Sequence, residues 1–311
     1  MRSDELKTVA ARHVPGEGEP EIHRLKGGLV NETYRVLRGG CAYVLRVAAS
    51  NPYDLGLDRA WEARVLQFAV LDDVAPAVEY CDPALGVLIS RWVEGRSWRP
   101  VDVRQQSNIS RVAELARRIH ALPLPAPARV MNPKRWIEYY SAAAPRTAAA
   151  PRTAAAPSSA AALQTAAGLR LNALAALPSV DSVLCHSDLH TLNLIDRGHS
   201  LMLLDWEYAH AADPLWDLAG WSANNDLDSE LQLDLLANYA GRTPTGEEFT
   251  RMRLLGWLYD YVCLLWSELY LSLPCGTDRY GAMPGDSAPA ATTDGVSDRA
   301  RLLEARLKAS L

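Results

Sequence analysis

The stretch Cys185-His-Ser-Asp-Leu-His-Thr-Leu-Asn-Leu-Ile195, followed by Leu203-Leu-Asp-Trp-Glu-Tyr208, contains the most informative pattern in this chain. Hydrophobic runs that predict short strands frame a His-x-Asp-x-x-x-x-Asn loop and a later Asp. In such a layout Asp188 can orient an attacking hydroxyl, while Asn193 and Asp205 offer the hard oxygen ligands that Mg²⁺ prefers. Each residue alone would indicate a turn, but the three at this spacing predict a site of phosphoryl transfer.

Composition limits the class of protein to which the 311 residues can belong. Hydrophobic residues make up 49% and charged residues 22%, which predicts a globular fold. A net charge of -5 argues against a nucleic-acid partner, because such proteins carry a basic face. The chain has neither a long apolar run for a membrane span nor an apolar signal-peptide core. The five scattered cysteines fit reduced thiols, so we expect a cytoplasmic protein.

The first part of the chain has the pattern of a small α+β lobe, expected at residues 1–93. Alternating and hydrophobic runs bounded by Gly and Asp predict its strands. These strands are expected at residues 22–26, 32–37, 41–47, 77–80 and 86–92. Apolar residues at helical spacing predict one helix over residues 57–71.

Residues 94–311 are expected to form a larger, mainly α-helical lobe. Two short strands are predicted within 183–206, and a loop is predicted over 274–296. The predicted helices cover residues 103–122, 133–141, 160–177, 213–223, 229–239, 246–273 and 297–310. The segment 142–159 repeats Ala-Ala-Ala-Pro-Arg-Thr, and its regularly spaced prolines forbid a continuous helix. We therefore expect a flexible surface insertion there.

Polar groups of the first lobe are candidates for phosphate binding. The segment Gly27-Gly28-Leu-Val-Asn31 would let backbone N–H groups approach phosphate oxygens, although a Gly-Gly pair between strands also fits a plain hairpin. Arg46, in the third strand, can bind phosphates bidentately, and Glu62 on the next helix can pair with it. Taken singly, Arg46 could also be an exposed strand residue, and Glu62 could lie on a solvated helix face.

The histidines near the motif allow a different interpretation. His186, Asp188 and His190 are similar in spacing to the ligands of metal-dependent hydrolases. The sequence offers no further His/Cys cluster to complete such a cage. We therefore expect His186 to orient the loop by hydrogen bonding, and His190, His199 and His210 to lie at the surface or behind the site.

Several ordered segments resemble the choline/ethanolamine kinases, which belong to the wider aminoglycoside-phosphotransferase-like group. The segments are Gly-Gly-Leu-Val-Asn-Glu-Thr-Tyr-Arg-Val (27–36), Tyr-Val-Leu-Arg-Val (43–47), Ile-Ser-Arg-Trp-Val-Glu-Gly (89–95), Ile-His-Ala-Leu-Pro (119–123), His-Ser-Asp-Leu-His-Thr-Leu-Asn-Leu (186–194), Leu-Asp-Trp-Glu-Tyr-Ala (204–209) and Asp-Pro-Leu-Trp-Asp-Leu-Ala (213–219). The resemblance implies a bilobal α+β fold like that of protein kinases, with ATP in the cleft between the lobes.

The same resemblance implies roles for individual residues. Asp188 matches the catalytic Asp, and Asn193 and Asp205 match the magnesium ligands. Residues 90–93 match the hinge that binds adenine. The residues expected to bind ATP are Asn31, Arg46, Glu62, Ser90, Arg91, Trp92 and Val93.

The acceptor implied by the resemblance is a small cationic alcohol. Choline or ethanolamine is expected first, thiamine second and an aminoglycoside third. The expected acceptor-site residues are Glu207, Asp217, Asp260, Trp266 and Tyr270, since aromatic faces and acidic groups attract a cation. Tyr259, Cys263, Trp266 and Tyr270 share one helix face, which also fits plain core packing. Cys263 stands where the family has Trp, which removes one wall of such a cage.

An alternative of a different class is a nucleotide-binding pseudokinase that acts as a scaffold. The catalytic and metal-binding positions of the motif are intact, which favours the enzyme.

Overall fold

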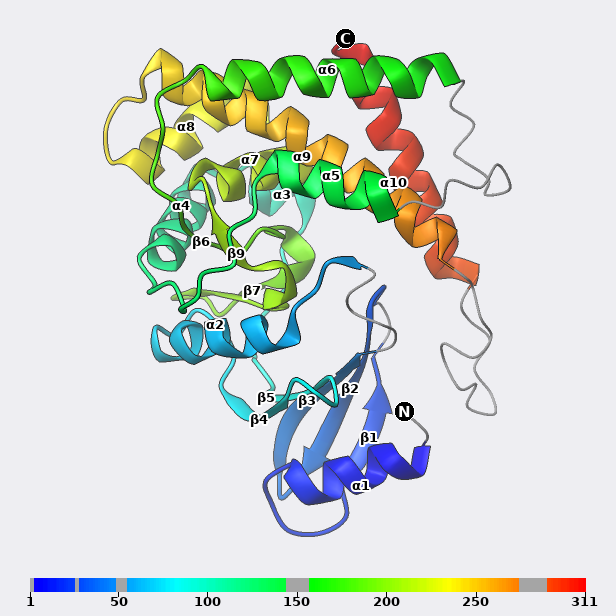
Figure 1. Ribbon diagram of the computed structural model, residues 1–311. Coiled ribbons are helices and arrows are strands. Elements are labelled where there is room, and N and C mark those ends of the chain that lie inside the picture. The colour runs from blue at the N-terminus through cyan, green and yellow to red at the C-terminus, as the bar shows by residue number, and fades with distance from the viewer. Residues whose placement is uncertain (1–2, 26–27, 49–54, 144–156, 274–289) are drawn as a thin grey trace.

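An antiparallel sheet of five strands forms the N-terminal end of the molecule (Figure 1). The computed structural model describes residues 3–25, 28–48, 55–143, 157–273 and 290–311. The strands are β1 (Glu21–Arg24), β2 (Asn31–Arg38), β3 (Cys41–Ala48), β4 (Val78–Asp82) and β5 (Val87–Arg91). Their order in the sheet is β1-β2-β3-β5-β4. The five strands predicted for this region are confirmed, with small shifts at their ends.

Strand β3 shows how alternation in the sequence separates the two faces of the sheet. Tyr43, Leu45 and Val47 are buried and pack with Leu6 and other apolar residues of α1 (Ser3–His13) in a small core. Arg46 lies between them in sequence and therefore points to the opposite face, where it lines a cavity. Helix α1 was not predicted from the sequence.

Helix α2 (Arg59–Leu71) packs with the helical part of the molecule. It begins where the side chain of Asp58 accepts a hydrogen bond from the backbone of Trp61 at 2.9 Å. The buried Trp61 and Val65 belong to the large core of the helical lobe rather than to the core beneath the sheet. Trp61 Nε1 also donates to the carbonyl of Ala209 at 2.7 Å. A lobe boundary at residue 93 stays a prediction.

The remaining helices form the larger part of the structure (Figure 1). They are α3 (Pro100–Val103), α4 (Gln106–His120), α5 (Pro133–Ala143), α6 (Pro157–Ala175), α7 (Leu215–Asn224), α8 (Ser229–Ala240), α9 (Gly246–Ser272) and α10 (Ala290–Ala309). Helix α9 begins with a capping box formed by Thr245 and Glu248 and contacts α5, α6, α7 and α10. It is therefore the central helix of this lobe.

Several predicted boundaries were wrong. The helix predicted over 103–122 is present as α4 but begins later, at Gln106, after a turn in which the Asn108 amide donates to the carbonyl of Asp102 at 2.9 Å. The predicted loop over 274–296 ends by Ala290, where α10 begins in an alanine-containing segment. Helix α6 starts at Pro157, in line with the preference for proline in a first helical turn.

Some expectations fall outside the described residues. These are the loop conformation expected for residues 274–289, the flexibility expected for the repeat at 144–156, and the phosphate contact expected at Gly27.

Two small antiparallel strand pairs carry the motif. The strands are β6 (Val183–Cys185), β7 (Leu194–Asp196), β8 (Leu201–Leu203) and β9 (His210–Ala212). Strand β6 pairs with β9, and β7 pairs with β8. The segment 183–206 thus holds three strands rather than the predicted two. This pairing brings the β6–β7 loop, which carries Asp188, close to Asp205 after β8.

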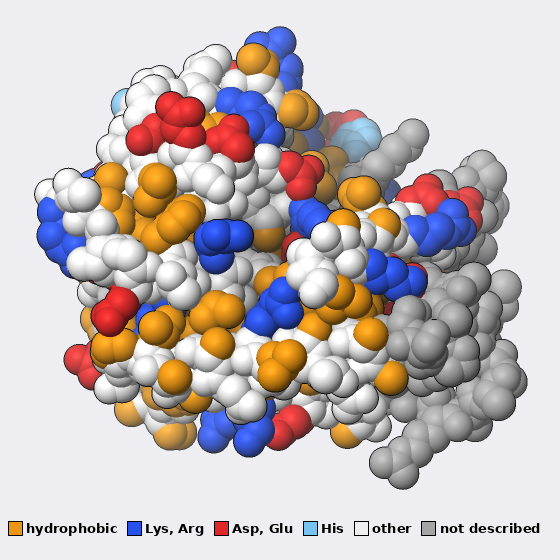
Figure 2. Space-filling model, turned by 90° about the horizontal axis from the view of Figure 1, so that it is seen from above, with side chains coloured by type: hydrophobic (Ala, Val, Ile, Leu, Met, Phe, Trp, Pro, Cys, Tyr) orange, Lys and Arg blue, Asp and Glu red, His pale blue; other side chains and the backbone are white. Residues whose placement is uncertain are grey.

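The outer surface of the helical lobe is mixed in character. Seen from above, its hydrophobic side chains lie in small groups separated by polar and basic ones (Figure 2). None of the helices in the described ranges combines the length and the apolar character that crossing a bilayer requires.

Candidate active site

A cavity of about 700 Å³ lies between the sheet and the helices and collects most of the predicted site residues. All seven residues expected to bind ATP line it, as do Asp188, Asn193, Asp205, Glu207 and Trp266. His186, Asp217, Asp260 and Tyr270 are absent from its wall. The structure therefore brings together the predicted catalytic, metal and nucleotide residues, but only part of the predicted acceptor site.

The sheet side of the cavity has the apolar walls that a flat base requires. The apolar residues that line the sheet side of the cavity include Val44, Val78, Leu88, Ile195 and Leu204. Strand β5 and the residues after it, 90–93, form the adjoining edge. A Cβ atom on Gly28 would lie 2.4 Å from the carbonyl oxygen of Asn31, so only glycine fits where the chain passes this edge.

Asp188 is held in place by its neighbours in the β6–β7 loop. The Asn193 amide donates to Asp188 Oδ2 at 3.0 Å and to its backbone oxygen at 3.1 Å. His190 Nε2 lies 3.3 Å from Asp188 Oδ2. Burial opposes ionisation of Asp188, but His190 lowers its pKa to about 2. The carboxylate is therefore ionised near neutral pH and can accept a hydrogen bond from a hydroxyl.

The backbone of this loop is fixed from behind by a buried carboxylate. Asp217 accepts hydrogen bonds from the backbone N–H groups of His186 at 2.9 Å and Ser187 at 2.7 Å. Ser187 has φ 69°, a left-handed conformation that needs such support. The sequence analysis placed Asp217 at the acceptor; it points instead into the protein and supports the catalytic loop.

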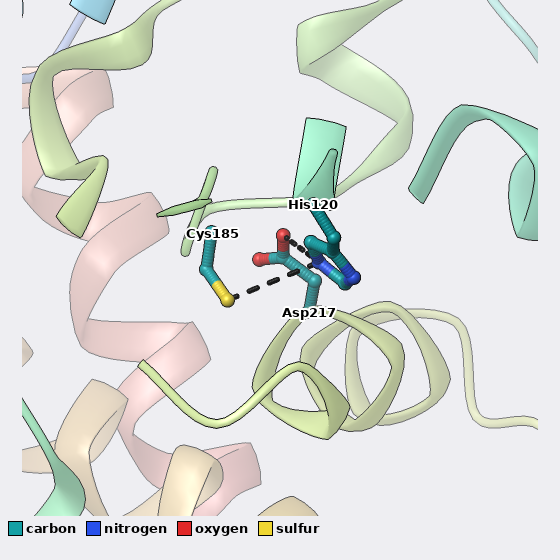
Figure 3. Close-up of side chains that lie close together, drawn as sticks. All are labelled: His120, Cys185 and Asp217. Atoms are coloured by element: carbon teal, nitrogen blue, oxygen red, sulfur yellow. Dashed lines mark hydrogen bonds and ion pairs between the residues drawn. The ribbon is translucent and has the colours of Figure 1, made fainter. Parts of the chain in front are cut away.

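Asp217 belongs to a small buried cluster with His120 and Cys185 (Figure 3). His120 Nε2 lies 3.2 Å from Asp217 Oδ2 and 3.9 Å from Cys185 Sγ. The second ring nitrogen of His120 bonds the hydroxyl of Tyr239 at 2.8 Å. Burial raises the pKa of Cys185 well above its ordinary value, so it remains a thiol. Hydrogen bonds thus account for these groups, which form a chain from Tyr239 to the catalytic loop.

The hydrogen bonds of His186 argue against a hydrolase metal site formed by His186, Asp188 and His190. His186 Nε2 binds the carbonyl of Leu204 at 2.9 Å, and its Nδ1 accepts from the backbone of Asp188 at 3.3 Å. Both ring nitrogens are therefore engaged within the loop. His186 orients the loop by hydrogen bonding, as the sequence analysis expected.

A buried ion network joins the sheet, α2 and the segment after β8. Arg46 binds Glu62 at 2.6 Å and Asp205 at 2.7 Å. Arg59, which the sequence analysis missed, binds Glu62 at 3.0 Å and Glu207 at 2.7 Å. Its position three residues before Glu62, on the same helix face, was the available signal. The network fixes the acidic groups at one edge of the cavity.

The carboxylates of this network outnumber its arginines. Burial and the nearby charge of Asp205 raise the pKa of Glu207 to about 7, although two arginines oppose the shift. Burial likewise raises the pKa of Asp205, and Glu62 and Asp188 act in the same direction. A divalent cation would relieve this repulsion, and Asn193 and Asp205 provide oxygen donors on the same cavity wall. The donor set therefore fits Mg²⁺.

The far part of the cavity, which we call the aromatic end, is lined by rings from several elements. The rings are Trp136, Tyr140, Tyr208, Trp216, Tyr259 and Trp266. Trp266 Nε1 donates to the Tyr208 hydroxyl at 2.6 Å. Cys263 and Arg299 also line this part. Of the six rings, only Tyr259 and Trp266 were considered from the sequence, where core packing was favoured for Tyr259.

Two predicted acceptor residues are directed elsewhere. Asp260 is buried and paired with Arg306. The hydroxyl of Tyr270 donates to the carbonyl of Leu29 at 3.1 Å, and its ring stacks on Trp266. Helical spacing identified the shared face of α9 but could not say which of its residues reach the cavity.

Solved structures of other proteins share this architecture over nearly their whole length. A choline/ethanolamine kinase family protein from Mesorhizobium loti superposes with a TM-score of 0.70 at 25% identity, covering 97% of this chain and 95% of that chain. The choline kinase LicA from Streptococcus pneumoniae gives 0.74 at 19% identity, with 97% and 98% covered. A structure of LicA in complex with AMP gives 0.72 at 19%, with 98% of both chains covered. The bilobal, protein-kinase-like α+β fold predicted from the sequence is thereby confirmed.

Sequence comparison gives a shorter match to a curated relative and a long match to a family. The LicA homologue of Mycoplasma capricolum is 27% identical over 95 residues, which are 30% of this chain and 37% of that protein. The model of the phosphotransferase enzyme family (APH) matches residues 21–255. This match covers more than half of the chain, which therefore belongs to the phosphotransferase enzyme family.

Proposed function

We propose that this phosphotransferase uses ATP and Mg²⁺ to phosphorylate the hydroxyl group of a small cationic alcohol, with choline and ethanolamine as the first candidates. The observation that carries this proposal is the convergence of Asp188, Asn193 and Asp205 on one cavity that residues 90–93 also line. The structure of LicA in complex with AMP supports a nucleotide as one ligand. The relative from M. loti supports an acceptor of the choline or ethanolamine type.

Asp188 is suited to orient the acceptor. The acceptor hydroxyl donates a hydrogen bond to the ionised carboxylate, which aligns the oxygen with the γ-phosphorus of ATP. A new bond forms between the acceptor oxygen and the γ-phosphorus, and the bond from that phosphorus to the β–γ bridging oxygen breaks to release ADP. With a pKa of about 2, Asp188 accepts the proton late, after the oxygen has become acidic through bonding to phosphorus.

Asn193 and Asp205 would hold the magnesium ion, which neutralises phosphate charge when bound. Arg46 already lies against Asp205 and Glu62, so its guanidinium is fixed at the edge where the phosphates are expected. Glu207 is held by Arg59 and by the Asn31 amide, each at 2.7 Å. These contacts keep the acidic groups in place while the phosphates and the metal bind.

The aromatic end supports a positively charged acceptor. Ring faces attract cations, and the effect is greater where water is excluded. Trp136, Tyr140 and Tyr259 are almost fully buried yet line the cavity, so their rings are protected from bulk water.

The test is transfer of phosphate by the purified protein with ATP, Mg²⁺ and either choline or ethanolamine. ADP release is measured with a coupled assay, and the phosphorylated product is identified by mass spectrometry. Asp188→Asn should lower kcat by about 10²- to 10⁴-fold while leaving ATP affinity largely intact. Asp181→Asn, at an exposed position, removes the same charge and serves as the control.

Two results would count against the proposal. Near-wild-type turnover of Asp188→Asn would remove its catalytic role. Nucleotide binding without transfer to any amino alcohol would favour a scaffold instead.

A further inference from the structure

A cation, Arg299, lies at the aromatic end of the cavity and forms no salt bridge with any carboxylate of the described residues. It comes from α10 and lines the cavity beside Tyr259 and Cys263. Its guanidinium donates to the side-chain oxygen of Asn224 at 3.1 Å, which is a neutral partner. Within the described ranges, no ion pair joins Arg299 to an acidic side chain. Its guanidinium therefore has N–H donors left for a ligand.

The nearest acidic groups on neighbouring helices are used by another arginine. Arg306, two helical turns further along α10, pairs with Asp226 at 2.6 Å and with Asp260. Asp260 had been expected to attract a cationic acceptor, but its charge is thus balanced inside the protein. Asp217 is likewise turned toward the catalytic loop. The aromatic end consequently presents a guanidinium that lacks a salt bridge to any described residue, at a place where acidic side chains were expected.

Accessibility supports a role in binding. Arg299 is exposed at the rim, whereas the adjacent Tyr259 is buried. Asp188 lines the same cavity. A small molecule whose hydroxyl reaches Asp188 can therefore place a second group near Arg299. An acidic group placed there would be attracted to Arg299, while the amine of the same molecule can lie against the aromatic rings.

We propose that the acceptor carries a carboxylate, bound by Arg299, in addition to its amine and its hydroxyl. This inference rests on the proposed function, which supplies the hydroxyl and its transfer, and it narrows the substrate class to hydroxy amino acids and related acidic amino alcohols. Guanidinium binds carboxylate through two parallel hydrogen bonds, which gives orientation as well as affinity. The carboxylate takes no part in the reaction, since the phosphate forms its ester with the hydroxyl and ADP leaves.

Matched pairs of acceptors that differ by one carboxylate test this inference. The pairs are L-serine with ethanolamine, and L-homoserine with 3-aminopropan-1-ol. For each acceptor, kcat/KM is measured with ATP and Mg²⁺, and the dissociation constant is measured separately by tryptophan fluorescence. The measurements are repeated on Arg299→Gln and on Arg301→Gln, a control on the same helix whose exposed guanidinium pairs with Asp298 at 3.0 Å.

The expected result is a preference for the carboxylated member of at least one pair. Arg299→Gln should lower kcat/KM for that member by roughly tenfold or more, and should change the value for its partner by less than about threefold. Arg301→Gln should leave both values near those of the wild type.

Each other outcome is decisive. Preference for the simple amine, or equal losses for both members in Arg299→Gln, would overturn the inference while leaving the proposed function standing. If no acceptor is phosphorylated, the proposed function fails, and the dissociation constants then decide the role of Arg299. In that case, the inference about Arg299 would be overturned if neither carboxylated compound bound more tightly than its partner.

Discussion

Replacing Asp217 by Asn tests whether the catalytic loop depends on the carboxylate behind it. The carboxylate accepts two backbone hydrogen bonds, at 2.9 and 2.7 Å, and bonds His120 at 3.2 Å. Burial acts to raise the pKa of Asp217, but the contacts with His120 hold it below its ordinary value, so the group is ionised. An amide of the same shape can accept only through its oxygen, and its NH₂ group would face one of the backbone donors.

The expected loss follows from these contacts. A hydrogen bond to a charged group contributes about 1.5–3 kcal/mol, so losing one and weakening another lowers the free energy of unfolding by about 3 kcal/mol. Ser187 would no longer be held in its left-handed conformation. If the active arrangement of the loop is destabilised by the same amount, kcat falls by about a hundredfold.

Urea unfolding and steady-state ADP release measure the two quantities. Asp181→Asn removes an equal charge from an exposed site and should change neither. A variant with wild-type kcat and wild-type unfolding free energy would refute the supporting role. A loss of stability with unchanged kcat would limit that role to folding.

Three further changes test other parts of the site. Arg59→Met removes one partner from Glu62, which keeps Arg46, and the 2.7 Å ion pair from the buried Glu207. Urea titration should show a loss of about 3 kcal/mol, which an unchanged midpoint would contradict. Arg111 holds the pKa of Asp196 below its ordinary value, so the stability this pair contributes is complete above that value and is lost as the pH falls. Wild-type stability should therefore drop between about pH 5 and pH 2, and Asp196→Asn should show a shallower drop. In Gly220→Ala the new Cβ would lie 2.8 Å from the Tyr259 ring, so the acceptor KM should rise while the KM for ATP stays constant.

The sequence was sufficient where chemistry depends on neighbours along the chain. Asp188, Asn193 and Asp205 stand at fixed spacing between hydrophobic runs, so their strands and loops could be predicted together. Alternation along β3 likewise places Arg46 on one face of the sheet and predicts a partner on the next helix, which the 2.6 Å contact with Glu62 confirms. Local periodicity carries this information without any knowledge of the tertiary structure.

The acceptor end could not be predicted in the same way. Its rings come from α5, α7, α9 and the segment after β8, and its cation comes from α10, so only tertiary packing brings them together. Asp260 and Asp217 carry the negative charge expected of a cation-binding site. Asp260 is paired with Arg306 and Asp217 with His120, and these pairings could not be identified from the sequence. Helix α1 was missed because its apolar face is narrow and its N-terminal position offered no motif.

Helix α2 and the sheet belong to separate hydrophobic cores, and this division affects how the molecule can move. Glu62 is attached to the helical body through Trp61, whereas Arg46 is carried by β3. A hinge rotation of the sheet would change the separation of these two side chains, and it would also shift Val78 and Leu88, the sheet residues that pack against the large core. Any such rotation would therefore also stretch the 2.6 Å contact between the guanidinium of Arg46 and the carboxylate of Glu62 at the edge of the proposed nucleotide site.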